Sequence, residues 1–96
     1  MAAVLLIRER MLFADGAIIE IKVWRVPENV PASRHDLKYS LFYGRPGVRL
    51  VGYDNERSKG DHRHYVDREE PYAFRSIEQL LADFKADVER IRGEAI

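Results

Sequence analysis

Branched apolar residues dominate two N-terminal segments, residues 4–13 and 17–26, which are separated by Ala14-Asp15-Gly16. Asp-Gly supplies the positive φ angles of a tight hairpin, so the two segments predict a pair of antiparallel strands. In the second segment Ile19, Ile21 and Val23 alternate with Glu20, Lys22 and Trp24. This period of two is typical of a sheet with one buried and one wetter face.

A second hairpin follows a proline-containing loop. Residues 27–36 hold two prolines, which lack the backbone donors of a strand ladder, and they predict a loop. Residues 37–43 again alternate between apolar and polar positions, and Gly44-Arg45-Pro46-Gly47 predicts a turn into a strand over residues 48–53. Residues 62–66 are long enough for a short fifth strand.

The C-terminal segment has the chemistry of a helix. Ser76 and Gln79 form a capping-box pattern, and Gly93 is a natural stop, so the sequence predicts a helix over residues 77–92. Its apolar residues recur at helical spacing on one face, and Asp87 is among the charged residues expected on the other. The apolar set is Ile77, Leu80, Leu81, Phe84, Val88 and Ile91. We therefore predict a single α+β domain over residues 1–96, with an antiparallel sheet of about five strands and one C-terminal helix packed on one face.

Composition narrows the function classes. Among the 96 residues, sixteen basic and sixteen acidic side chains leave no net charge, so any contact with nucleic acid must use a local patch. The chain has no cysteine, which excludes disulfide scaffolds and thiol catalysis. The apolar run of residues 1–7 ends at Arg8, too early for a signal peptide or a membrane helix. We expect a cytoplasmic protein without membrane contact.

The polar segment over residues 53–64 carries the candidate chemistry. His62 and His64 are two residues apart, so in an extended chain both rings project from the same side. Cleavage of RNA through the ribose 2′-hydroxyl needs one group that takes a proton and one that gives a proton. Imidazoles can do both near neutral pH. Asp61 or Asp54 can orient an imidazole, and Asp54 is also a candidate contact to the substrate.

Such a reaction also needs a cation for the phosphate, and aromatic rings can stack on the bases. The candidate cations are Arg57, Lys59 and Arg63, and the candidate stacking rings are Tyr53 and Tyr65. Between residues 37 and 64 the basic side chains Lys38, Arg45, Arg49, Arg57, Lys59 and Arg63 outnumber the acidic Asp54, Glu56 and Asp61. In an extended segment Arg63 points away from both histidines. Lys59 or Arg57 is then the expected cation, unless the chain bends at Gly60 and Asp61.

Two other interpretations of these residues remain open. His62 and His64 can join Asp54, Asp61 or His35 as nitrogen and oxygen ligands of a metal ion. Alternatively, the segment is a solvated surface loop without chemistry. The aromatic residues Trp24, Tyr39, Phe42 and Tyr43 are interpreted as core or sheet-surface packing.

Residues 51–64, VGYDNERSKGDHRH, followed by EEPYAF over residues 69–74, resemble the signature of the TumE family of toxin-antitoxin proteins. Similar stretches are ADGAIIE (14–20), VWRVP (23–27), LLADF (80–84) and DV (87–88), so the resemblance covers nearly the whole chain. It implies a small toxin of a bacterial or archaeal toxin-antitoxin pair. It also implies an antitoxin with a DNA-binding helix-turn-helix or winged-helix domain, which neutralises the toxin and represses the operon.

Three functional hypotheses follow. The first is a metal-independent endoribonuclease, without a cofactor, in which His62 and His64 form the acid-base pair and RNA is the substrate. The second is a non-catalytic binding toxin or interaction module, whose His62-Arg63-His64 segment contacts the antitoxin or a cellular target. The third is a metal-dependent nuclease that uses the same histidines. A chelator separates the first from the third, and the absence of turnover identifies the second.

Overall fold

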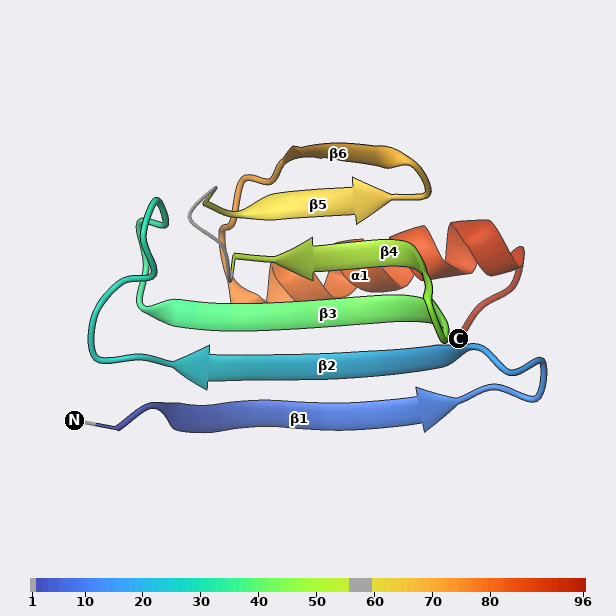
Figure 1. Cartoon of the computed structure of the whole chain (residues 1–96), viewed down its shortest axis with the longest axis horizontal. Helices are drawn as coiled ribbons and strands as arrows, with labels where there is room; N and C mark the ends of the chain where they lie inside the picture. The colour runs from blue at the N-terminus through green and yellow to red at the C-terminus, as the bar shows by residue number, and fades with distance from the viewer. Residues whose placement is uncertain (1, 56–59) are drawn as a thin grey trace.

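In a computed structural model, which describes residues 2–55 and 60–96, the chain folds into a six-stranded antiparallel sheet and one helix (Figure 1). The strands pair in sequence order, so every connection joins neighbours. The elements are β1 (Val4–Leu12), β2 (Ile18–Arg25), β3 (Leu37–Arg45), β4 (Val48–Asp54), β5 (His62–Tyr65), β6 (Arg68–Pro71) and α1 (Ile77–Arg92). This order confirms the predicted α+β fold, with six strands in place of about five.

The additional strand is β6, which pairs with β5 across a turn at Val66, a residue with a φ of 56°. Its four residues are all exposed, and they include two glutamates and Pro71. A short polar strand has no hydrophobic alternation to reveal it, and proline is tolerated because β6 is at the edge of the sheet. The sequence pattern therefore could not predict it.

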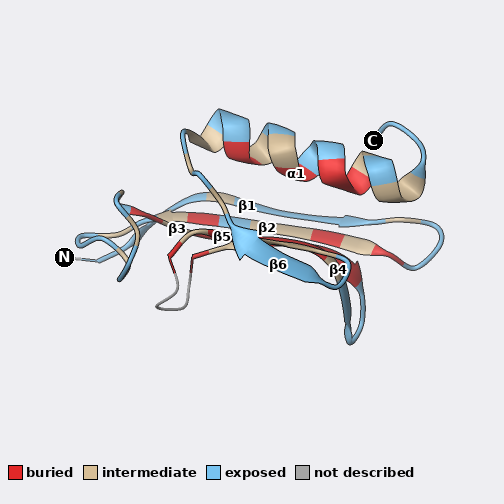
Figure 2. Ribbon diagram, turned by 90° about the horizontal axis from the view of Figure 1, so that it is seen from above, coloured by how far each residue is buried: buried red, intermediate tan, exposed pale blue. Residues whose placement is uncertain are grey.

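The two faces of the sheet differ in what covers them (Figure 2). Helix α1 lies across one face, which we call the helix face, and the core lies between them. The sheet residues buried there include Ile19, Val23, Leu37, Tyr39, Leu41, Tyr43, Val51 and Tyr53. The alternate residues of β2 to β5 point to the opposite face, which we call the open face. No element of the described chain covers it.

Helix α1 begins and ends where the sequence predicts. Ser76 accepts a hydrogen bond from the Gln79 backbone amide at 3.0 Å, and Gly93 ends the helix with a φ of 72°. The Gln79 side chain, however, donates to Asp83 at 2.8 Å and does not complete the capping box. Asp87, expected on the solvent side, is buried. No helix of the described chain is both long and apolar enough to span a bilayer.

Candidate functional site

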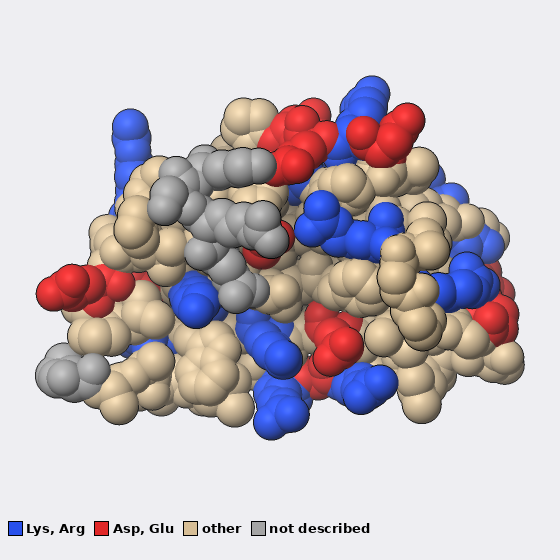
Figure 3. Space-filling model, in the orientation of Figure 1, with Lys and Arg blue, Asp and Glu red and all other residues tan. Residues whose placement is uncertain are grey.

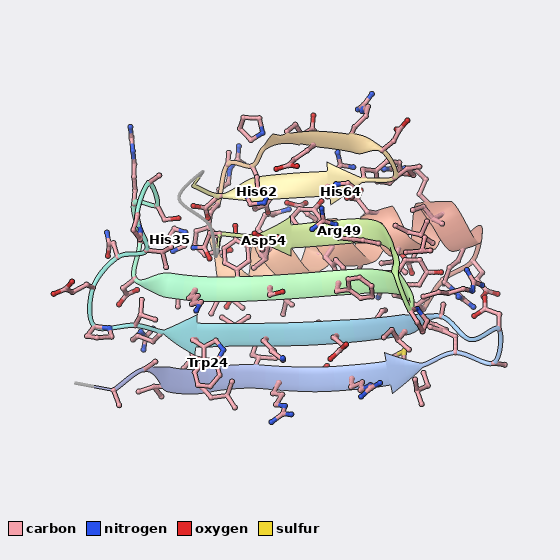
Figure 4. The ribbon with its side chains drawn as sticks, viewed as in Figure 1. Trp24, His35, Arg49, Asp54, His62 and His64 are labelled. Carbon is pink, nitrogen blue, oxygen red and sulfur yellow. The ribbon has the colours of Figure 1, made fainter. Side chains whose placement is uncertain are left out.

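Strand pairing places both candidate histidines on the open face. His62 lies opposite Asp54, and His64 lies opposite Gly52, on the neighbouring strand β4. Figure 4 shows the two rings on one side of the sheet together with Asp54 and Arg49. The side chains of β5 therefore alternate as predicted, with both imidazoles on one face.

His62 is nearly buried, with 8% of its surface exposed, and each ring nitrogen faces an oxygen acceptor. Nδ1 lies 3.1 Å from the Gly60 carbonyl, and Nε2 lies 3.1 Å from Asp54 Oδ1. Glu69 Oε1 is 3.7 Å from the same Nε2. Only the imidazolium donates from both nitrogens, so this set of partners matches the protonated ring.

His64 has the opposite arrangement. Arg49 Nη2 lies 3.2 Å from His64 Nδ1, and His64 Nε2 lies 2.6 Å from the Val66 carbonyl. A guanidinium only donates hydrogen bonds, so Nδ1 is the acceptor and Nε2 carries the hydrogen. These contacts match the neutral form of His64, with the lone pair at Nδ1 directed at a cation. The partners of the two histidines thus match the complementary forms that an acid and a base require.

Arg49 lies between Asp54, the partner of His62, and His64. Its guanidinium lies 4.0 Å from Asp54 and contacts His64, while 40% of its side chain remains exposed. The side chain lies over Gly52, since a Cβ built on that glycine would be 2.8 Å from Arg49 Cδ. We call His62, Asp54, Arg49 and His64 the open-face site. Its members come from adjacent strands, so the sheet itself fixes their spacing.

Asp61 belongs to a different cluster. It accepts hydrogen bonds from Ser33 at 2.5 Å, from Tyr39 at 2.7 Å and from His35 at 2.6 Å. Burial raises the pKa of Asp61, but these hydrogen bonds outweigh it and leave the pKa below its ordinary value. Neither His62 nor His64 is among its partners, so the predicted catalytic carboxylate instead ties loop residues 27–36 to the start of β5.

Arg63, Tyr53 and Tyr65 lie on the helix face. Arg63 donates to Asp87 from Nε at 2.7 Å and from Nη2 at 2.9 Å, and it also contacts Glu70. The hydrogen bonds to Asp87 raise the pKa of Arg63 above its ordinary value. Tyr53 donates to the same carboxylate at 2.6 Å, which explains why Asp87 is buried. Arg63 also lies over the Tyr65 ring.

Two further predictions concern Arg57 and Lys59, which lie outside the described residues. Within residues 2–55 and 60–96, no group of three or more His, Asp or Glu side chains is arranged to hold a metal ion. His35, a candidate ligand by sequence, stacks on Phe74 with ring centroids 4.0 Å apart and donates to Asp61.

Sequence reasoning missed the place of Arg49 in the open-face site. Arg49 was counted among the basic residues but not placed in the site; its signal was its position on the strand that precedes the histidines. Tyr39 and Tyr43 are buried, as their interpretation as core residues predicts. Trp24 and Phe42 are partly exposed on the open face.

A family model described as toxin TumE matches residues 2–92 of the 96-residue chain. The chain belongs to the TumE toxin family. No curated protein and no solved structure matches it significantly. As a TumE-family member, it is a toxin of a toxin-antitoxin system and has a cognate antitoxin as its partner. The open-face site lies within the residues of this chain that the TumE family model matches.

Proposed function

We propose that this toxin is a metal-independent endoribonuclease and that the open-face site is its catalytic centre. The supporting observation is the complementary hydrogen bonding of the two histidines. His62 faces acceptors at both nitrogens, and His64 directs an acceptor nitrogen at a cation. Paired proton donors and acceptors on one surface are what cleavage through a 2′-hydroxyl requires.

The reaction then uses each ring in the form that its hydrogen-bond partners match. His64 Nδ1 takes the proton of the ribose 2′-hydroxyl, and the 2′-oxygen bonds to phosphorus. The bond from phosphorus to the 5′-oxygen breaks, and that oxygen takes the Nε2 proton of His62. The products are a 2′,3′-cyclic phosphate and a free 5′-hydroxyl. The Gly60 carbonyl holds His62 at Nδ1 while its Nε2 hydrogen turns from Asp54 to the leaving oxygen, and the Val66 carbonyl holds the tautomer of His64.

Arg49 is the cation of this proposal. Its exposed guanidinium can turn to the phosphate oxygens, and that movement frees Nδ1 of His64 to act as the base. Arg57 and Lys59 stay candidates for a second phosphate contact. Arg63 has a structural role in the proposal, because Asp87 and Glu70 occupy its guanidinium on the other face.

The test is incubation of the purified toxin with labelled single-stranded RNA, with and without a chelator. Cleavage that persists in chelator and leaves 2′,3′-cyclic phosphate ends supports the proposal. Loss of cleavage in chelator indicates the metal-dependent nuclease. Binding without any turnover indicates the non-catalytic toxin, and both of these results contradict the proposal.

We also propose where the antitoxin binds. Strand β1 is a sheet edge, so one side of its backbone has no partner strand, and Leu5, Met11 and Leu12 are exposed on it. A hollow of about 410 Å³ between β1, β2 and α1 has an apolar lining that includes Ile21 and Phe84. The opposite edge, β6, has only four residues and ends at a proline. An added strand from the antitoxin therefore fits β1 better.

A further inference from the structure

Two aromatic side chains of the sheet have no aromatic or cationic partner among the described residues. The other Phe and Tyr rings all take part in ring-ring or cation-ring contacts, most of them in the core. Trp24 and Phe42 do not, and both lie partly exposed on the open face. Figure 4 shows Trp24 on the same side of the sheet as His62 and His64. An unpaired exposed ring is available to stack on a ligand.

Cations outnumber acids on the same face. Among the strand residues that point there, five are basic and three are acidic. The basic residues are Arg8, Arg10, Lys22, Lys38 and Arg49, and the acidic residues are Glu20, Asp54 and Glu69. Figure 3 shows Lys and Arg side chains spread across this face. No ion pair recorded within the described chain engages Lys22 or Lys38.

Small residues line a track between the histidines and Trp24, and the Arg49 side chain lies over its Gly52 end. Gly52 separates His64 from Phe42 on adjoining strands, and Ser40 separates Asp54 from Lys22. A hollow of about 230 Å³ is lined by Lys22, Trp24, Lys38 and Ser40, with Tyr39. Neighbouring strands are about 4.8 Å apart, so the track from β5 to β2 is about 14 Å long. That length suits a few nucleotides.

We propose that a single-stranded segment of RNA lies across the open face, from the open-face site on β5 to Trp24 on β2. Its bases stack on Phe42 and Trp24, and its phosphates lie beside Lys22, Lys38 and Arg49. This inference rests on the proposed function, and it adds the path of the substrate and its single-stranded character. Stacking accepts any base, so the face selects for unpaired RNA with little sequence preference.

The chemistry of the face favours RNA over a protein partner. Exposed apolar side chains, which a protein interface needs, are concentrated on β1, whereas the track combines separate aromatic rings with cations and small residues. A duplex would present paired bases that cannot stack on Phe42 or Trp24. A single strand uses both features of the track at once.

Trp24 is the chain's single tryptophan, so its fluorescence reports directly on the track. The probe is a short 2′-O-methyl oligonucleotide, which the intact toxin binds but cannot cleave through a 2′-hydroxyl. We expect saturable quenching of Trp24 that weakens with added salt. Phe42→Ala should raise Kd by about 5- to 100-fold, the loss of one stacked base. Lys38→Ala should raise Kd, while Lys85→Ala, an exposed cation on α1, should leave it unchanged.

Several results would overturn the proposal. The first is that dextran sulfate quenches Trp24 as strongly as the oligonucleotide does. The second is that Phe42→Ala and the wild type have equal Kd values. The third is that the antitoxin quenches Trp24 and the oligonucleotide does not. Circular dichroism of Phe42→Ala confirms that the variant is folded. If RNA is cleaved without Trp24 quenching, the proposed path of the RNA is wrong and the proposed nuclease activity is supported. If Trp24 is quenched and Phe42→Ala weakens binding without cleavage, the track stands and the nuclease is wrong.

Discussion

At the scale of single residues, the cross-strand neighbours of the histidines determine what each ring can do. The i, i+2 spacing was enough to place His62 and His64 on one face, because alternation within a strand is a local property. The partners of those rings were not local. Asp54 and Arg49 contact them from β4, and Asp61 contacts His35, so only strand register and loop packing select among the carboxylates.

Arg49 provides the first prediction at this scale. Arg49→Ala should reduce RNA cleavage by about 10²- to 10³-fold, the usual loss when a donor to a charged transition state is removed. Gly52→Ala is a matched probe, because its Cβ would lie 2.8 Å from Arg49 Cδ and must displace the side chain without removing it. We expect an intermediate loss in single-turnover kinetics. Full activity in both variants would show that Arg49 is not the phosphate cation.

Asp61 provides a prediction about stability. Its lowered pKa means that the ionised form stabilises the fold above the ordinary carboxyl pKa, and that this stability is lost as pH falls through the folded-state pKa. Asp61→Asn should lower the free energy of unfolding by about 1–3 kcal/mol near neutral pH, because an NH2 group replaces one of the two oxygens that accept hydrogen bonds from Ser33, His35 and Tyr39. In urea titrations the difference from wild type should shrink on acidification. The exposed Asp36→Asn serves as the control, and a difference independent of pH would refute the assignment.

At the scale of elements, sequence predicted what has a strong local pattern. Both hairpins have turn glycines and alternating apolar residues, and α1 has its cap, stripe and stop, so each was found from local chemistry. Strand β6 has none of these signals. Asp87 was misplaced for a related reason: a carboxylate is expected in solvent unless partners on another element, here Arg63 and Tyr53, hold it.

The contact between α1 and the sheet can be tested at Phe84. Its ring is buried and meets Tyr53 edge-on with centroids 6.1 Å apart. Phe84→Ala should lower the free energy of unfolding by about 3–5 kcal/mol through lost burial and a residual cavity. Ala86→Ser, at an exposed position of the same helix, is the control for thermal or urea melts. An unchanged melting temperature in Phe84→Ala would show that the stripe does not form the core.

At the scale of the whole molecule, the sheet separates two surfaces. The open face carries the candidate catalytic site, while the edge at β1 and the adjoining hollow carry exposed apolar residues. Composition showed only that any nucleic-acid contact must use a local patch, since the net charge is zero. The strands that supply this surface could not be assigned until the pairing order was known. Arg8, Lys22 and Lys38, remote in sequence, come together only through that order.

Antitoxin binding is the prediction at this scale. Co-expressed toxin and antitoxin should co-purify, and Leu12→Glu on β1 should reduce the recovered antitoxin, because it places a charge at an exposed apolar position of the proposed interface. Glu70→Gln on β6 is the control at the opposite edge. Failure of the wild-type pair to associate at micromolar concentration would contradict the role of this partner, and full recovery with Leu12→Glu would exclude β1.

The central claim is that His62 and His64 act together in RNA cleavage. The direct measurement is a double-mutant cycle of single-turnover cleavage rates for wild type, His62→Ala, His64→Ala and the double variant, with folding checked by circular dichroism. Each single change should cost about 10²- to 10⁴-fold, the contribution of one positioned acid or base. The double change should cost far less than the product of the two, because groups that act in one step fail as a unit. Wild-type cleavage by the double variant would contradict the account.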